Sequence, residues 1–262
     1  MRIGLHAAAL LALAASVQGT PSPAAAAPRT LTVAAAANLE PVLQELVRGF
    51  EDANPGATVR TTLGASGRFV AQIQQGAPFD LFLAADASYP ARLVEAGLSS
   101  GPAFPYAQGR LALWVPAGSR LDLEKAGLRA LLDPSVRKVA LGNPAVAPYG
   151  VAAEEAMRNA AVFDAVKERF VLGQSAAQAA QFGLSGAAQV AFLPLSLVLA
   201  PPLSTQGRHL ILPASSHRPI EQAGVILKGA RDPELARAFV AWLLGPDGRV
   251  ILARHGYEAP PG

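Results

Sequence analysis

Hydrophobic positions along this chain follow two different periods in turn, from residue 31 to the end. Short apolar runs, typical of buried strands, alternate with segments whose apolar residues recur every three or four positions, which is the period of a helix. In the segment 39–51 the apolar face of the expected helix consists of Leu39, Val42, Leu43, Leu46, Val47 and Phe50. The expected strands are 31–36, 58–63, 80–84, 110–115, 138–141, 169–172, 189–193, 209–212 and 223–227. The expected helices are 39–51, 67–75, 89–95, 149–159, 176–182, 233–244 and 247–255.

Alternation of strands and helices predicts parallel sheets that are covered by helices. A single doubly wound sheet would accommodate all the strands, but two Gly/Pro/Ser-rich segments, 101–109 and 213–219, bracket the middle of the chain. Each is followed by an apolar strand that would carry the chain from one lobe to the other. We therefore predict a two-lobed α/β fold with a mostly parallel sheet in each lobe. The first lobe comprises 28–108 plus 218–262, and the second comprises 109–217.

The first residues have the order of a secretory signal peptide. Met1-Arg2 is a short basic start, 3–17 is an Ala/Leu-rich apolar run, and 24–27 are four alanines. Such an order predicts removal of 1–27, with cleavage near Ala27. A membrane anchor is the alternative, but the run is shorter than the roughly 20 residues that span a bilayer. We expect the mature protein to work outside the cytoplasm.

Composition excludes several classes of protein. Charged residues make up 16 % of the chain, and the formal net charge of +3 is scattered without a long run of like charges, which argues against nucleic acid as a partner. Cysteine is absent from the sequence. This excludes a disulfide framework, thiol catalysis, zinc ligation by cysteine and an acylated-cysteine anchor.

Candidate chemistry lies where expected strands end and helices begin. Asn38, Ser66 and Ser175 each stand near such a junction, and the turn 142–150 before a further helix is rich in Gly, Pro and Ala. Open α/β sheets place ligand crevices at the carboxyl ends of their strands, and helix starts offer N–H donors with roughly half a positive charge. Each polar residue taken singly fits a simple helix cap. Four such starts facing one cleft favour a site for a dianion.

Enzyme chemistry has weaker support in the sequence. Residues 64–67 read Gly-Ala-Ser-Gly and resemble a nucleophile elbow, but Arg68 stands where that motif requires glycine. A secreted hydrolase using Ser66 would need a histidine within hydrogen-bond reach, and a triad assembled from distant residues stays open. The histidines of the mature chain match no zinc spacing. We therefore predict no catalysis, no cofactor and no bare metal ion.

Four segments resemble one known family, the periplasmic molybdate-binding proteins of ABC transporters. They read LTVAAAANLEPVLQELVRGFE (31–51), GASGRFVAQIQQGAPFDLFLAAD (64–86), LGNPAVAPYGVAAEEAM (141–157) and FVAWLLGPDGRVILARHGYE (239–258). The resemblance covers about 31–257, and GAPFDLFLAAD together with the APYG turn is fairly specific. It implies the two-lobed type II binding-protein fold with two crossover strands. It also implies a monomer that binds molybdate, as well as tungstate, and delivers the anion to a membrane permease.

The resemblance further implies a set of ligand-binding residues. Carried over by position, Asn38 takes the site at the first helix, Ser66 supplies a hydroxyl, Tyr149 lies in the third turn, and Ala176 contributes its backbone N–H. Many members have a tyrosine where this chain has Pro194. Proline offers neither a hydroxyl nor an N–H, so this donor is missing or is replaced, with Tyr149 as a candidate.

Two questions stay open at the level of sequence. Arg68 lies two residues after Ser66, where it is either solvated on the helix surface or tunes anion selectivity. A sulfate-type oxyanion sensor would bind a similar anion and signal to a receptor. The sequence does not separate such a module from a transport protein.

Overall fold

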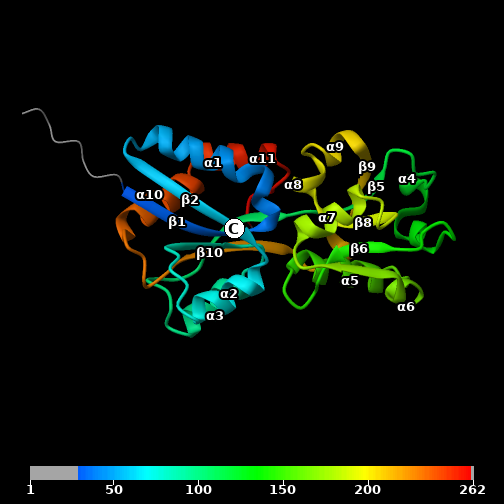
Figure 1. The fold of residues 1–262 in the computed structure, drawn as a ribbon, viewed down its shortest axis with the longest axis horizontal. Helices are drawn as coiled ribbons and strands as arrows, with labels where there is room; N and C mark the ends of the chain where they lie inside the picture. Colours follow the sequence, from blue (N-terminus) through cyan, green and yellow to red (C-terminus); the bar gives the residue numbers. More distant parts are fainter. Residues whose placement is uncertain (1–28, 261–262) are drawn as a thin grey trace, which may run out of the picture.

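The computed structural model describes residues 29–260, so the predicted signal peptide 1–27 lies outside the described residues. The described chain forms two lobes that lie side by side (Figure 1). A five-stranded sheet forms the centre of each lobe. The predicted two-lobed α/β architecture is confirmed.

The first sheet has the strand order β2-β1-β3-β10-β4. Its strands are β1 (Arg29–Ala36), β2 (Ala57–Gly64), β3 (Leu81–Ala84), β4 (Phe104–Gly109) and β10 (Ile220–Ile226). Strand β1 runs parallel to β2 and β3, whereas β10 is antiparallel to β3 and β4. Helices pack on both faces of this sheet; they are α1 (Glu40–Ala53), α10 (Pro233–Leu244) and α11 (Pro246–Arg254) on one face, and α2 (Ser66–Gln74) and α3 (Ser88–Glu95) on the other.

The second sheet has the strand order β7-β6-β8-β5-β9. Its strands are β5 (Leu111–Pro116), β6 (Val139–Gly142), β7 (Phe170–Gly173), β8 (Val190–Pro194) and β9 (Gly207–Ile211). The helices of this lobe are α4 (Leu123–Ala126), α5 (Pro148–Asn159), α6 (Phe163–Val166), α7 (Ala176–Leu184), α8 (Leu195–Val198) and α9 (Leu203–Gln206). Single 3-10 turns complete the chain at η1 (Ala37–Leu39), η2 (Gly127–Leu132), η3 (Lys167–Arg169) and η4 (Ala214–Ser216).

Both faces of the strands are apolar because both faces are covered. In β1, Leu31 and Val33 pack into the core beneath α1 and α10, while Ala34 packs into the core beneath α2. Parallel strands buried on both faces therefore read as continuous apolar runs. Helix α1 buries Leu46 and Phe50 in the same way, and fully burying one such side chain contributes about 1.5–3 kcal/mol to folding.

Each sheet is mixed, with two parallel and two antiparallel pairings. The chain passes from the first sheet to the second through Arg110, between β4 and β5, and returns through 212–219, between β9 and β10. The strands on which the chain enters each lobe, β5 and β10, are antiparallel to both of their neighbours. The mostly parallel sheets expected from strand–helix alternation are therefore mixed.

Strand β4 occupies a segment that the sequence marked as a break. Its Gly and Pro content indicated a loop over 101–109, yet 104–109 pairs with β10 at the edge of the sheet. Pro105 is tolerated because β4 is an edge strand and the pairing shifts register between Gln222 and Ala223. Main-chain hydrogen bonds to β10 hold this strand, and its buried side chains join the core of the first lobe.

Candidate functional site

Five chain segments converge on one small cavity between the lobes. Its volume is about 20 Å³, little more than the roughly 10–15 Å³ that one water molecule needs. The lining residues are Ala36, Ala37, Asn38, Gly64, Ala65, Ser66, Ala85, Ala147, Pro148, Tyr149, Ser175 and Ala176. None of them carries a charge. The cavity brings together Asn38, Ser66, Tyr149 and Ala176, the four residues expected at the site; their binding role stays a prediction.

The starts of three helices border this cavity. Ser66 is the first residue of α2, Pro148 the first of α5 and Ala176 the first of α7. Asn38 comes from the η1 turn just before α1. The first N–H groups of a helix have no partner within the helix, and this end carries partial positive charge. A neutral cavity at these positions offers hydrogen-bond donors without any opposing carboxylate.

Ser66 does not act as a helix cap. The N-cap of α2 is Ala65, and the Ser66 hydroxyl oxygen instead accepts a hydrogen bond from the backbone N–H of Ala85 at 3.0 Å. Ser66 is 1 % exposed. Since its oxygen is the acceptor in that bond, its own hydroxyl proton remains to be donated.

Asn38 is buried and is also not a cap. Its Nδ2 donates to Gln222 Oε1 at 2.9 Å and to the Tyr257 hydroxyl at 2.8 Å. The Tyr257 hydroxyl in turn donates to the Asn38 carbonyl oxygen at 2.8 Å, and the Ser196 hydroxyl donates to the same oxygen at 2.8 Å. Ser196 belongs to the second lobe, so the Asn38 backbone is held from both lobes.

The α5 start places Tyr149 in the cavity wall. The Tyr149 hydroxyl accepts from Gln222 Nε2 at 3.0 Å. Close packing fixes this turn, because a Cβ added to Gly150 would lie 2.0 Å from the carbonyl oxygen of Gly142. Only glycine permits such an approach of the helix to the end of β6.

Of the three polar residues that the sequence placed near helix starts, only Ser175 caps its helix, α7. The Ser175 hydroxyl accepts from the Gln178 N–H at 3.3 Å, so Ser175 has the capping role that the sequence allowed. Ala176 follows and is buried. It presents backbone and a methyl group, which leaves its N–H as its polar contribution.

Three buried tyrosines stay protonated around the site. Burial raises the pKa of Tyr106, of Tyr149 and of Tyr257 above the ordinary tyrosine value. A phenol with a raised pKa remains a neutral hydrogen-bond donor at neutral pH. These groups therefore add no negative charge beside the cavity.

The two lobes touch across the cleft next to this cavity. The Gly67 N–H donates to the Val146 carbonyl oxygen at 3.2 Å, and Arg68 Nη2 donates to Gln174 Oε1 at 2.5 Å. Both bonds join the start of α2 to the second lobe. Arg68 is absent from the cavity lining, and its guanidinium pairs with a neutral amide. In the structure Arg68 therefore makes a contact between the lobes and does not line the cavity.

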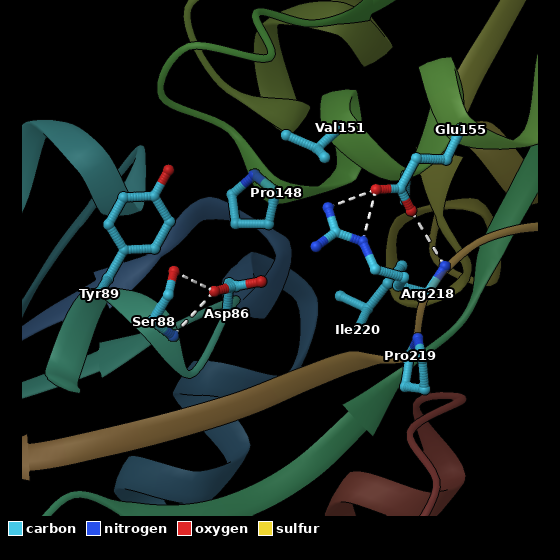
Figure 2. Close-up of a pocket in the computed structure, with 10 residues that line it drawn as sticks. Asp86, Ser88, Tyr89, Pro148, Val151, Glu155, Arg218, Pro219 and Ile220 are labelled. Atoms are coloured by element: carbon cyan, nitrogen blue, oxygen red, sulfur yellow. Dashed lines mark hydrogen bonds and ion pairs between the residues drawn. The ribbon is translucent and has the colours of Figure 1, made fainter. Parts of the chain in front are cut away.

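A second and larger cavity of about 430 Å³ lies beside the crossover segment (Figure 2). Asp86 of the first lobe, Glu155 of α5 and Arg218 line it. Arg218 is already engaged, because its Nε donates to Glu155 at 2.7 Å and its backbone N–H donates to the same carboxylate at 3.0 Å. Carboxylates on both sides disfavour an oxyanion there. The small neutral cavity is the better candidate despite its size.

Residues 29–260 also bear on a hydrolase, a metal site and a membrane span. No histidine lines the cavity that contains Ser66. Within these described residues no group of three His, Cys, Asp or Glu side chains is placed to hold a metal ion. Among the helices of the same region, none has both the length and the apolar character to cross a bilayer. Pro194 is buried at the end of β8 but does not line the cavity.

Gln222, Tyr257 and Ser196 were missed by sequence reasoning. Gln222 and Ser196 lie next to expected strands, outside every element that the sequence predicted. Tyr257 follows the last helix and reads as a tail residue. These three residues share a hydrogen-bond network with Asn38 and Tyr149, which forms where the two lobes meet. A buried polar residue within an apolar run was the one available signal.

Comparison with known proteins agrees with this geometry. The family described as bacterial extracellular solute-binding proteins matches residues 31–258. A molybdate-binding protein of Rhodobacter capsulatus is 36 % identical over 244 residues, which cover 93 % of each chain. The solved periplasmic molybdate-binding protein of Azotobacter vinelandii superposes with a TM-score of 0.82 at 32 % identity, covering 88 % of this chain and 100 % of that one.

A more distant structure shows how widely the fold is used. The sulfate-binding protein of Mycobacterium tuberculosis has a TM-score of 0.73 at 19 % identity, over 88 % of this chain and 87 % of that one. This likeness concerns the fold alone, since one fold hosts different cargoes. The match over residues 31–258 shows that this chain belongs to the bacterial extracellular solute-binding proteins, the wider group of the molybdate-binding proteins that its sequence resembles.

Proposed function

We propose that this protein binds molybdate, and tungstate as its close analogue, in the small cavity between the lobes and delivers the anion to the membrane permease of an ABC transporter. The observation that carries the proposal is a cavity without a charged side chain at the starts of α2, α5 and α7. Helix starts favour anions through N–H donation and the partial positive charge of the helix end. Kinship with proteins named for molybdate supports this choice of anion.

Asn38, Ser66, Tyr149 and Ala176 are the proposed contacts. The Ser66 hydroxyl has a proton to donate, and Ala176 offers a backbone N–H at a helix start. An anion that carries no proton needs only donors, and the neutral lining offers no carboxylate to accept from a protonated anion. Capture rather than catalysis is proposed because no histidine lines the cavity beside Ser66 in the described part of the chain.

Closure of the two lobes on the anion is the proposed mode of capture. The moving bodies are 28–108 plus 218–262 and 109–217, joined by the crossovers at Arg110 and 212–219. The bond from Gly67 to Val146 crosses the cleft beside the cavity and would form on closure. We propose that the protein is exported to the periplasm after removal of 1–27 and acts there as a monomer.

Calorimetric titration of the mature protein against molybdate, tungstate, sulfate and phosphate tests this proposal. Molybdate and tungstate are expected to bind at a single site much more tightly than sulfate, with phosphate showing the weakest binding. Equal affinity for sulfate and molybdate would make the protein a general oxyanion binder. Absence of binding to all four anions would remove the proposed function.

A further inference from the structure

Gln222 lies behind the cavity and contacts a site residue from each lobe. It belongs to β10, the strand on which the chain re-enters the first lobe, and it is 0 % exposed. Its Oε1 lies 2.9 Å from Asn38 Nδ2, and its Nε2 lies 3.0 Å from the Tyr149 hydroxyl. Gln222 is not in the cavity lining, so its influence on a bound anion would pass through these two neighbours.

The surroundings are shaped around this side chain. The pairing of β10 with β4 shifts register between Gln222 and Ala223, and such a bulge turns a side chain toward a particular place. A Cβ added to Gly109 would lie 2.1 Å from the Tyr149 hydroxyl oxygen and 2.7 Å from Gln222 Nε2. Any residue other than glycine at 109 would displace this contact.

Protons and acceptors do not balance in this network. The Tyr106 hydroxyl has one proton but faces two acceptors, the Ala84 carbonyl oxygen at 3.0 Å and Gln222 Oε1 at 2.8 Å. Both Nδ2 protons of Asn38 are used by Gln222 and Tyr257. Asn38 Oδ1 is the one buried side-chain polar atom in residues 29–260 that has no hydrogen-bond partner. The unpaired end of this cavity-lining amide is thus an acceptor, which would repel an oxyanion.

Turning both amides end for end corrects these mismatches. Gln222 Nε2 then donates to Asn38 Oδ1 and to the Tyr106 hydroxyl, and Gln222 Oε1 accepts the Tyr149 proton. The proton of Tyr106 is free to go to Ala84. Asn38 keeps the bond from Ser196 to its carbonyl oxygen, while the Tyr257 proton moves to Asn38 Oδ1. The free end of Asn38 becomes Nδ2, a donor that suits an oxyanion.

We propose that Gln222 is a positioning residue for oxyanion capture. With both amides in this orientation, Gln222 holds Asn38 so that its Nδ2 faces the anion, and its contact with Tyr149 ties the pair to the second lobe. This inference rests on the proposed binding function and adds a residue that does not itself touch the anion. It also assigns a role to a polar side chain that is fully buried in the crossover strand.

A double-mutant cycle on molybdate affinity tests the proposal. Gln222→Met keeps the size of the side chain and removes both amide ends, and it is expected to weaken binding about tenfold or more. Asn38→Ala is expected to weaken binding by a similar factor. If Gln222 acts through Asn38, the double variant binds about as weakly as the weaker single variant. Multiplied effects, or wild-type affinity of Gln222→Met, would overturn the proposal.

Gln222→Glu provides a second readout if the methionine variant does not fold. A carboxylate only accepts hydrogen bonds, so it would hold Asn38 with Nδ2 turned inward, and protonation would restore a donor. The affinity of this variant relative to wild type is expected to fall at neutral pH and to recover as the pH is lowered. Wild-type affinity throughout would overturn the proposal.

The control is Asp80→Asn, which disturbs a buried carboxylate away from the cavity lining. It is expected to lower the melting temperature and leave molybdate affinity unchanged, as a purely structural change should. These measurements separate failure of the proposed binding function from failure of the proposed role of Gln222. If the wild type binds no molybdate, the function fails; if it binds, and Asn38→Ala weakens binding while the Gln222 variants do not, only the role of Gln222 fails.

Discussion

At the scale of single residues, similar polar side chains at helix starts have different hydrogen-bond partners. Ser175 accepts from the N–H three residues ahead and caps α7, while Ser66 accepts from Ala85 on another strand. Asn38 is used by Gln222 and Tyr257 instead of by its own helix. A side chain that is not needed by its helix is free to serve a ligand.

Removal of the Ser66 hydroxyl is expected to weaken binding without unfolding the protein. Loss of one hydrogen bond to a charged ligand costs about 1.5–3 kcal/mol, so Ser66→Ala should reduce molybdate affinity roughly ten- to a hundredfold in calorimetry. Asp232→Ala is the control, because Asp232 caps α10 and is not among the residues that line the cavity. That variant should lose stability through both the cap and the ion pair with Arg29 and keep its affinity. Lower stability with unchanged affinity in Ser66→Ala would show instead that Ser66 has a structural role.

At the scale of secondary-structure elements, the ends of helices meet across the cleft. The start of α2 touches the loops before α5 and α7 through Gly67 and Arg68. Parallel pairing of β1 with β2 and of β6 with β7 places the following helix starts at the same edge of each sheet. The direction of the strands thus brings the helix starts to the cleft.

Arg68 and Gln174 are expected to govern release more than recognition. Their contact joins the lobes, and Arg68 does not line the cavity, so Arg68→Ala should weaken molybdate binding by no more than about tenfold. Dissociation measured by stopped flow should accelerate about two- to tenfold, because only the closed form loses a bond. Gln174→Ala should have the same effect, and the two should not add. A loss beyond about a hundredfold in affinity would show instead that Arg68 holds the anion.

At the scale of the whole molecule, four apolar cores form, one on each face of each sheet. Ion pairs anchor the outer end of the first lobe. The Asp80 carboxylate is 1 % exposed and accepts from the Thr32 N–H at 2.6 Å and from Arg231 at 2.8 Å. Burial opposes its ionisation, but these hydrogen bonds lower the pKa of Asp80 below the usual aspartate value.

Acid is expected to destabilise the protein through such carboxyls. The hydrogen bond from Arg29 and the N–H of Leu235 lower the pKa of Asp232 to about 2. A carboxyl with a lowered folded-state pKa stabilises the fold above its unfolded pKa, and this contribution is lost as the pH falls through the folded value. The free energy of unfolding, measured by urea titration, should therefore fall between about pH 4 and about pH 2. Asp232→Asn should flatten this decline.

Asp164→Asn is the control for that measurement. Asp164 is 87 % exposed and pairs only with Lys167 within its own turn, and such surface pairs contribute little. Its variant should keep the wild-type acid dependence. A decline of equal steepness in Asp232→Asn and the wild type would contradict the assignment.

The sequence by itself determined most of the elements and the four candidate site residues. Buried strands and amphipathic helices such as α10 depend on local periodicity, which is written in consecutive residues. Asn38, Ser66, Tyr149 and Ala176 could be named because strand ends and family motifs are also local, and the structure brings all four to one cavity.

Only the tertiary structure decided which residues surround that site and how the strands pair. The Gly and Pro content of its segment hides strand β4 in the sequence, and its place is fixed by main-chain bonds to β10, more than a hundred residues later. Gln222 meets Asn38 and Tyr149 only because the crossover strand passes between two lobes, with separations of 184 and 73 residues. Contacts between residues so far apart in the sequence depend on the path of the chain in space, and a local sequence pattern does not indicate them.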